Sequence, residues 1–205
     1  MSRPARRRAS ALLCIAFVSS APAPARVCRD APFPEYVQKL QALTPAVAVE
    51  RPAPADVARF FAALPRDFEC FNHLFGYYDD AGPFYAKPYL HLLFRHIARA
   101  VPERDYVAKI VGLSVNAHGQ ADQTGALQRA SREILDRRAH VFVAALEPLD
   151  AASERSVWAF LFGAPHPSNT PLTLEVQARV CKASERSCES SKQAYARARL
   201  NERRH

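Results

Sequence analysis

The chain has 205 residues, 49% of them hydrophobic, and a formal net charge of +8. Its 6 glycines and few β-branched runs argue against a β-sandwich or barrel, and its length suits one domain with a substantial core. The positive charge lies at the two ends, because four arginines precede residue 9 and segment 182–205 has 7 basic residues against 3 acidic ones. The middle is close to neutral, which argues against a nucleic-acid-binding face across the domain.

Residues 1–25 have the pattern of an export signal. The four arginines form a positive start, residues 11–18 are an apolar run too short to span a bilayer, and Ala23-Pro24-Ala25 suits a cleavage site. We therefore expect a periplasmic or secreted protein without stable membrane insertion after cleavage. An uncleaved N-terminal anchor remains an alternative. Lipidation is disfavoured because Cys14 lies inside the apolar run rather than after a small residue.

The remaining sequence predicts short helices separated by proline, glycine and capping residues. The expected helices cover residues 34–43, 55–64, 67–75, 87–100, 103–114, 121–138, 151–162, 172–182 and 185–200. Segment 44–54 is rich in proline and alanine and is expected to be a link. The apolar segment 140–146 is either a buried helix or a strand, because its periodicity does not decide. The expected fold is an irregular multi-helix all-α domain at 55–205, preceded by an N-terminal segment and linker at 26–54.

Particular residues are expected to begin or end these helices. Gly76 suits the end of the third helix, and Asp150 suits the N-cap of helix 151–162. Thr170-Pro171 combines an N-cap residue with a proline at the first helical position.

Four cysteines follow the signal: Cys28, Cys70, Cys181 and Cys188. An even number in an exported protein favours two disulfides. On one continuous helix, the Cα atoms of Cys181 and Cys188 would lie roughly 10.5 Å apart, whereas a disulfide tolerates at most about 7 Å. Their pairing therefore requires a helix break near Ser184, which could act as an N-cap. We favour Cys28–Cys70 with Cys181–Cys188. Crossed pairing is the alternative, and a zinc site is disfavoured.

Catalytic and metal-binding patterns are absent from the sequence. His91 and His96 would lie about 140° apart on a helix, so helical spacing does not allow them to bind the same metal ion. No nucleophile-elbow motif occurs, and Cys70 near His73 is expected to be bridged rather than nucleophilic. We expect neither a metal nor a cofactor.

Two loops are candidate partner-binding sites. The first contains aromatic and acidic residues between two glycines, and its candidate contact residues are Tyr77, Tyr78, Asp79, Asp80 and Tyr85. Tyrosine suits recognition because it offers a rigid amphipathic surface. The second loop holds His166 between Pro165 and Pro167. Each has a structural alternative, in which Phe84 and Tyr85 pin the first loop to the core and the second is a rigid helix connector.

The order of several motifs is also informative. These motifs are Leu64-Pro65, Phe68, Phe71, Phe75-Gly76-Tyr77, Gly82-Pro83-Phe84-Tyr85, Tyr89 to Phe94, Gln120-Ala121-Asp122 and Trp158-Ala159-Phe160-Leu161-Phe162-Gly163-Ala164-Pro165-His166-Pro167. The chain resembles a largely uncharacterised family of small bacterial helical proteins with G-P-[LF]-Y and F-W-x-F-x-F-D-G-P-H-P-like motifs. The resemblance covers about residues 64–195 and implies a helical fold but no activity. Gly163-Ala164 departs from the Asp-Gly of that family, so no role of the acid carries over.

We therefore expect an exported binding protein of the immunity or inhibitor type, which occludes a protein partner such as a toxin directed at the cell envelope. Asp79 and Asp80 would complement a basic partner, and the loop tyrosines would supply contact area. Two alternatives remain: an envelope hydrolase or metal-dependent enzyme using His73 or His166, and an envelope assembly or maintenance factor. A nucleic-acid partner is not expected.

Overall fold

The computed structural model describes residues 32–76, 84, 89–118, 122–163 and 174–202. Within these ranges every regular element is a helix, which confirms the expected all-α fold. The helices are α1 (Pro32–Val47), α2 (Pro54–Ala63), α3 (Phe68–Phe75), α4 (Tyr89–Ala100), α5 (Glu103–Ser114), α6 (Asp122–Leu146), α7 (Ala151–Phe162), α8 (Leu174–Ala183) and α9 (Glu185–Glu202).

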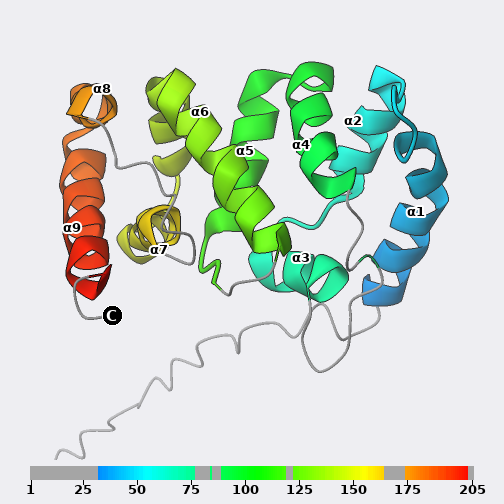
Figure 1. Ribbon diagram of the computed structural model, residues 1–205, viewed down its shortest axis with the longest axis horizontal. Coiled ribbons are helices and arrows are strands. Elements are labelled where there is room, and N and C mark those ends of the chain that lie inside the picture. The colour runs from blue at the N-terminus through cyan, green and yellow to red at the C-terminus, as the bar shows by residue number, and fades with distance from the viewer. Residues whose placement is uncertain (1–31, 77–83, 85–88, 119–121, 164–173, 203–205) are drawn as a thin grey trace, which may run out of the picture.

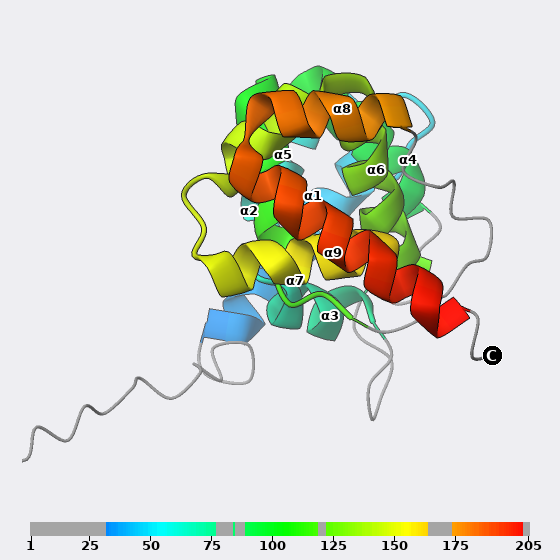
Figure 2. The same ribbon diagram turned by 90° about the vertical axis from the view of Figure 1, so that its left-hand side faces the viewer.

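The helices form an elongated array with α1 at one end and α9 at the other (Figure 1). α1 packs against α2, α2 against α4, α6 against both α5 and α8, and α8 against α9. α3 and α7 lie along one side of this array, and α7 also packs against α9 (Figures 1 and 2). α4, α5 and α6 contact one another in the middle of the molecule.

The expected capping residues account for several helix boundaries. The Asp150 carboxylate accepts hydrogen bonds from the backbone N–H groups of Ala152 and Ser153, at 2.8 and 2.9 Å. Asp67 caps α3 in the same way, by accepting from the Cys70 N–H at 2.8 Å. Gly76 ends α3 as expected, but with an extended backbone at φ −88° rather than the left-handed conformation of a common glycine cap. A Cβ at Gly76 would lie 2.3 Å from the Asn72 carbonyl oxygen, so close approach is the reason for glycine.

The first helix is longer than the sequence suggested. α1 continues through Thr44 and Pro45, which were expected to begin the link, and ends only at Val47. The Thr44 hydroxyl donates to the Leu40 carbonyl at 2.7 Å. The added turn places Val47 in the core at 3% exposure. Burial of this apolar residue therefore outweighs the local preference against proline within a helix.

α6 is two helical segments joined at a kink. Arg138 has a non-helical backbone, with φ −143° and ψ 51°, at the position where the polar helix was expected to end. The apolar segment after it is helical, which decides between the two structures left open for 140–146. Phe142, Val143 and Leu146 from this segment are buried.

One apolar core runs through the array. Trp158, Phe142 and Phe162 form an aromatic group at one end, with 5.7 Å between the ring centroids of Trp158 and Phe142. Phe71, Phe75 and Phe84 form a second group near α3. α1 falls in the segment assigned to 26–54, and its Leu40 and Val47 belong to the same core as α2.

The expected Cys181–Cys188 disulfide is present, with 4.3 Å between the two Cα atoms. The helix is broken at Ser184, where the backbone N–H of Cys188 donates to the Ser184 carbonyl at 2.9 Å. Cys70 is also disulfide-bonded, to a cysteine outside the described residues. Crossed pairing of Cys181 or Cys188 with the N-terminal part is therefore wrong.

A buried acidic residue lies beneath this disulfide-closed turn. Glu154 on α7 is fully buried, and its carboxylate accepts hydrogen bonds from the Trp158 indole N–H at 3.2 Å and the Ser187 hydroxyl at 2.7 Å. Arg186 forms an ion pair with Oε2 of the same carboxylate at 2.6 Å. The turn that the disulfide closes thus supplies two partners for a charge that would be costly to bury alone.

Candidate binding groove

A groove of about 630 Å³ lies where α4, α5 and α6 meet. Its floor is formed by buried, mainly apolar side chains: Phe94, Tyr106, Val107, Ala126, Ala130 and Ile134. Its rim is formed by charged side chains: Arg99, Glu103, Arg129, Glu133, Arg137 and Arg138. We call this the arginine groove. Its volume lies within the range of about 300–1,000 Å³ that is typical of ligand sites.

Helical spacing places the rim and the floor on adjacent faces. Arg129, Glu133 and Arg137 follow one another at intervals of four residues on α6, so they line one edge. Ala126, Ala130 and Ile134 repeat the same interval on the neighbouring face and point inward. The small alanines allow α4 and α5 to approach α6 without filling the groove. This local pattern produces a charged edge above an apolar floor.

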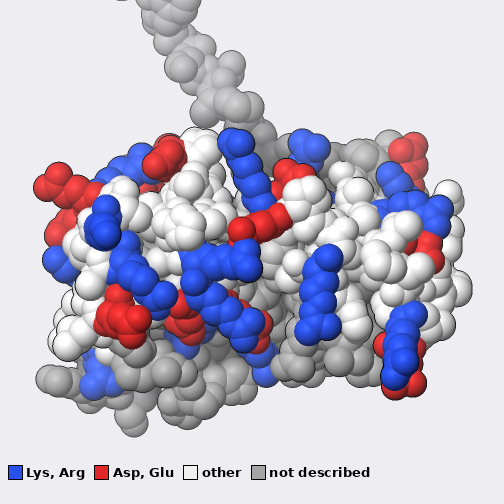
Figure 3. Space-filling model, turned by 90° about the horizontal axis from the view of Figure 1, so that it is seen from above, with Lys and Arg blue, Asp and Glu red and all other residues white. Residues whose placement is uncertain are grey.

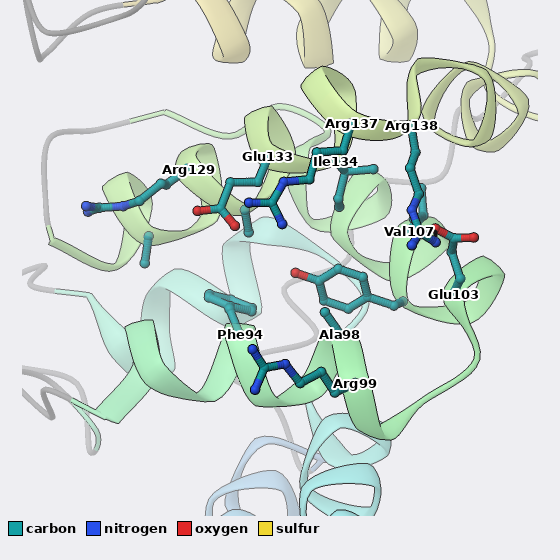
Figure 4. A pocket seen from close by; sticks show the side chains of 13 residues that line it. Phe94, Ala98, Arg99, Glu103, Val107, Arg129, Glu133, Ile134, Arg137 and Arg138 are labelled. Carbon is teal, nitrogen blue, oxygen red and sulfur yellow. Dashed lines mark ion pairs between the residues drawn. The ribbon is translucent and has the colours of Figure 1, made fainter.

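The two walls direct charged side chains toward each other. Figure 4 shows Glu133 and Arg137 of α6 pointing toward α4, and Arg99 of α4 pointing back toward α6. Phe94 lies between these walls. Arg129 points outward at one end of the groove (Figure 4). The groove therefore combines an aromatic surface with guanidinium groups from opposite sides.

One rim arginine is already paired. Arg138, at the kink of α6, forms an ion pair with Glu103 in the first turn of α5. Arg99, Arg129 and Arg137 have no ion pair within 4.0 Å among the described residues. The groove thus retains an excess of positive charge after its internal pairing. Such guanidinium groups are suited to carboxylate or phosphate ligands.

Tyr106 contributes a polar atom to the otherwise apolar floor. Burial, and to a lesser extent the Glu133 carboxylate, raises the pKa of the Tyr106 phenol well above its ordinary value. A tyrosine phenol is neutral at physiological pH, and the raised pKa extends this neutral state to higher pH, so Tyr106 retains its O–H donor. The floor can therefore donate a hydrogen bond as well as make apolar contacts.

The molecular surface is not uniformly basic. Figure 3 shows lysine and arginine side chains spread along one face of the array, with acidic side chains interspersed among them. This mixture differs from the continuous basic stripe that nucleic-acid-binding proteins present.

The partner-binding residues expected from the sequence lie outside the described residues. They are Tyr77, Tyr78, Asp79, Asp80, Tyr85 and His166, and with them lies Cys28. Their role stays a prediction. Phe84 is described: it is 3% exposed, its N–H donates to the Leu74 carbonyl at 2.9 Å, and its ring packs against Phe75. The structural alternative, in which Phe84 and Tyr85 pin this loop to the core, is therefore confirmed for Phe84, whereas Tyr85 lies outside the described residues.

The arginine groove was missed by sequence reasoning. Its residues come from three helices, and no single motif contains them. The interval between Arg129, Glu133 and Arg137 was a local signal, because it places three charges on one face. That spacing is also typical of a solvated helix surface, so only the approach of α4 distinguishes a groove from an ordinary exposed face.

No family model, curated protein or solved structure matches this chain. The resemblance inferred from its motifs therefore stays a prediction. Among the described residues, no group of three or more His, Cys, Asp and Glu side chains is placed to hold a metal ion. None of the described helices combines the length and apolarity needed to cross a membrane.

Proposed function

We propose that the protein is an exported binding protein of the immunity or inhibitor type, and that the arginine groove forms part of its partner-binding surface. The observation that carries this proposal is that one groove combines an apolar floor with three arginines that form no ion pair with any described residue. Arginine and aromatic residues are enriched at the energetic centres of protein interfaces. The groove offers both on adjacent sides.

The cysteine chemistry supports the export part of this proposal. Cys181 and Cys188 are bridged and Cys70 is also disulfide-bonded, and disulfides persist mainly in oxidising compartments. The pattern of residues 1–25 gives independent support. A disulfide-bonded helical array provides the rigid surface that an occluding protein requires.

The charge of the groove indicates which part of the partner it would contact. Exposed arginines attract an acidic region, and such complementarity accelerates association and selects among partners. The predicted contacts of Asp79 and Asp80 would engage a basic region of the same partner. The two surfaces would then recognise opposite charges.

The proposal can be tested with the full chain carrying a C-terminal tag, expressed in the cells that normally produce it. Material from the envelope and the medium is purified with and without the double substitution Arg99→Glu and Arg137→Glu. We expect a stoichiometric protein partner that the double variant loses. Arg104→Glu is the matched control, because Arg104 is an exposed arginine near the groove that does not line it.

Cells lacking the gene provide the functional readout. If the protein is an immunity protein, these cells become sensitive to the captured partner, and the wild-type gene restores resistance. Unchanged sensitivity would contradict the inhibitor role. A partner that binds the double variant as well as the wild type would instead exclude the groove as the contact surface.

A further inference from the structure

We propose that the arginine groove takes an extended acidic peptide segment, with an apolar side chain on the floor and carboxylates on Arg99 and Arg137. This inference deepens the proposed function and rests on it, because it names the chemistry of the partner segment. It commits to a peptide rather than to a free anion, a lipid or a nucleic acid. The reasons lie in the charges, the floor and the size of the groove.

The placement of the arginines favours carboxylates on two sides of a ligand. Arg99 and Arg137 project from opposite walls, and neither has an ion pair among the described residues (Figure 4). A guanidinium group binds a carboxylate through two parallel N–H donors. Successive side chains of an extended segment point to opposite faces, so an apolar side chain directed at the floor leaves the acidic side chains on either side of it directed at the rim, where Arg99 and Arg137 lie.

The floor favours an apolar side chain between those carboxylates. Phe94 is 4% exposed, Tyr106 7% and Ile134 8%, so each presents only a small part of its surface to the groove. A ligand side chain placed there would exclude water from these atoms and from the arginines above them. Desolvation strengthens the neighbouring charge contacts. The neutral Tyr106 phenol can donate to a ligand carbonyl or carboxylate.

Glu133 disfavours a highly charged polyanion. Its carboxylate lies on the rim beside Arg137 (Figure 4), where it would repel the negative charge of a phosphate group bound at that arginine. A peptide with separated acidic side chains can place a polar or apolar atom near Glu133 instead. The groove volume of about 630 Å³ also exceeds what a single phosphate or carboxylate needs. Together these features suit a segment of several residues.

The test uses three end-capped peptides of twelve residues. The acidic peptide alternates glutamate with leucine and carries one central phenylalanine, the second has glutamine in place of glutamate, and the third has lysine. Calorimetry with the full-length secreted chain is expected to detect the acidic peptide alone. Because a charged hydrogen bond contributes roughly 1.5–3 kcal/mol, Arg137→Gln should weaken binding by about tenfold or more. Arg99→Gln with Arg137→Gln should weaken it further.

Arg104→Gln is the matched control and is expected to leave peptide affinity unchanged. All three arginines are exposed, so an unchanged melting temperature verifies that each variant is folded. Equal binding of the glutamine or lysine peptide would overturn the proposal, as would an equal loss with Arg104→Gln. Complete displacement of the acidic peptide by millimolar inorganic phosphate, or by vesicles of phosphatidylglycerol, would assign the groove to another anion and also overturn it.

The two proposals fail in different ways. If the tagged protein loses its partner in the Arg99→Glu and Arg137→Glu variant while no acidic peptide binds, the protein-binding function stands and the acidic-segment inference is wrong. If the acidic peptide binds as expected but cells lacking the gene show no sensitivity to any partner, the groove chemistry stands and the inhibitor function is wrong.

Discussion

At the helix ends, cationic side chains donate hydrogen bonds to backbone carbonyl groups, whereas three arginines of the groove donate to no described residue. Lys109 binds the carbonyls of Phe61 and Leu64 at the end of α2, at 2.6 and 2.9 Å. Arg132 binds the Leu161 carbonyl at the end of α7 at 3.0 Å. Carbonyl groups at a helix C-terminus lack intrahelical partners and carry partial negative charge, so these cations stabilise the fold.

Arg99, Arg129 and Arg137 have no such acceptor among the described residues, although Arg129 and Arg137 lie on the same helix as Arg132. Arg129 and Arg132 both belong to α6, but Arg132 reaches α7 and Arg129 points outward (Figure 4). The cationic side chains of this chain therefore fall into two structural sets. One set of cations bonds to the carbonyl ends of helices, and the other forms no ion pair with a described residue. Substitutions should separate the two sets.

The largest effect is expected at Arg132. Replacing it with methionine keeps much of the stem but leaves the Leu161 carbonyl without its charged donor. We expect Arg132→Met to lower the free energy of unfolding by about 2.5 kcal/mol, because hydrogen bonds to charged groups contribute roughly 1.5–3 kcal/mol. Urea denaturation measures this change. A loss below about 0.5 kcal/mol, as for an ordinary surface substitution, would show that the carbonyl is satisfied in another way.

A smaller effect is expected at Lys109, which is only partly buried and whose Nζ lies 4.8 Å from the centroid of the Phe61 ring. Lys109→Met should lower the free energy of unfolding by about 1.5 kcal/mol, the lower end of the range for charged hydrogen bonds. Chemical denaturation at pH 7 is the measurement. A variant as stable as wild type would remove Lys109 from the set of structural cations.

The lowered pKa of Lys109 predicts that the stability of the protein depends on pH. Burial, followed by the charges of Arg66 and Lys39, lowers the pKa of Lys109 from 10.5 to about 8. Because the unfolded chain then binds more protons between about pH 8 and 10.5, this residue makes the protein more stable as the pH rises through that window. Comparison of wild type with Lys109→Met across the window isolates this contribution. An identical pH profile for the two proteins would contradict it.

In contrast to Lys109, Tyr106 should make the protein less stable as the pH rises above 10. Its folded pKa is raised above the unfolded value of 10.0, so the folded chain holds a proton that the unfolded chain loses. The stability from this group is present below pH 10 and falls as the pH rises further. Ultraviolet titration should show one tyrosine that ionises later than the others. In Tyr106→Phe, that late transition should be missing; if it persists, the assignment is wrong.

The smallest effect on stability is expected for the groove arginines. Arg99→Gln and Arg137→Gln remove exposed side chains without a described ion pair, so each should change the free energy of unfolding by less than about 0.5 kcal/mol. Thermal and urea denaturation provide the measurement. A loss as large as that of Arg132→Met would place these arginines among the structural cations and erase the contrast between the two sets.

Local signals in the sequence predicted much of the helical framework. The Asp150 cap and the bounds of α5 and α7 followed from residues within one or two turns. The break near Arg138 was visible as a change from polar to apolar composition. The expected break at Ser184 followed from the length of a disulfide. Each of these features depends on neighbours in the chain, which is why sequence reasoning could reach them.

Features that depend on residues far apart in the chain were harder to predict from the sequence. The extension of α1 through Pro45 is stabilised by burial of Val47 in the common core, which the local sequence does not reveal. The arginine groove requires α4 and α5 to pack beside α6, and the same arginine spacing would occur on any solvated helix. The surroundings of these groove arginines are therefore set by the helices that pack beside α6.

The buried Glu154 also affects the order in which the chain can fold. Trp158, one of its hydrogen-bond donors, follows it by four residues, but Ser187 follows it by 33, so an emerging chain contains the acid long before Arg186 and Ser187 are made. A domain generally folds as a unit, once all of its parts are present. A chain that ends before Arg186 therefore lacks two of the three side chains that bond to the Glu154 carboxylate. The partners of this buried acid are thus complete only when the first turn of α9 has been made.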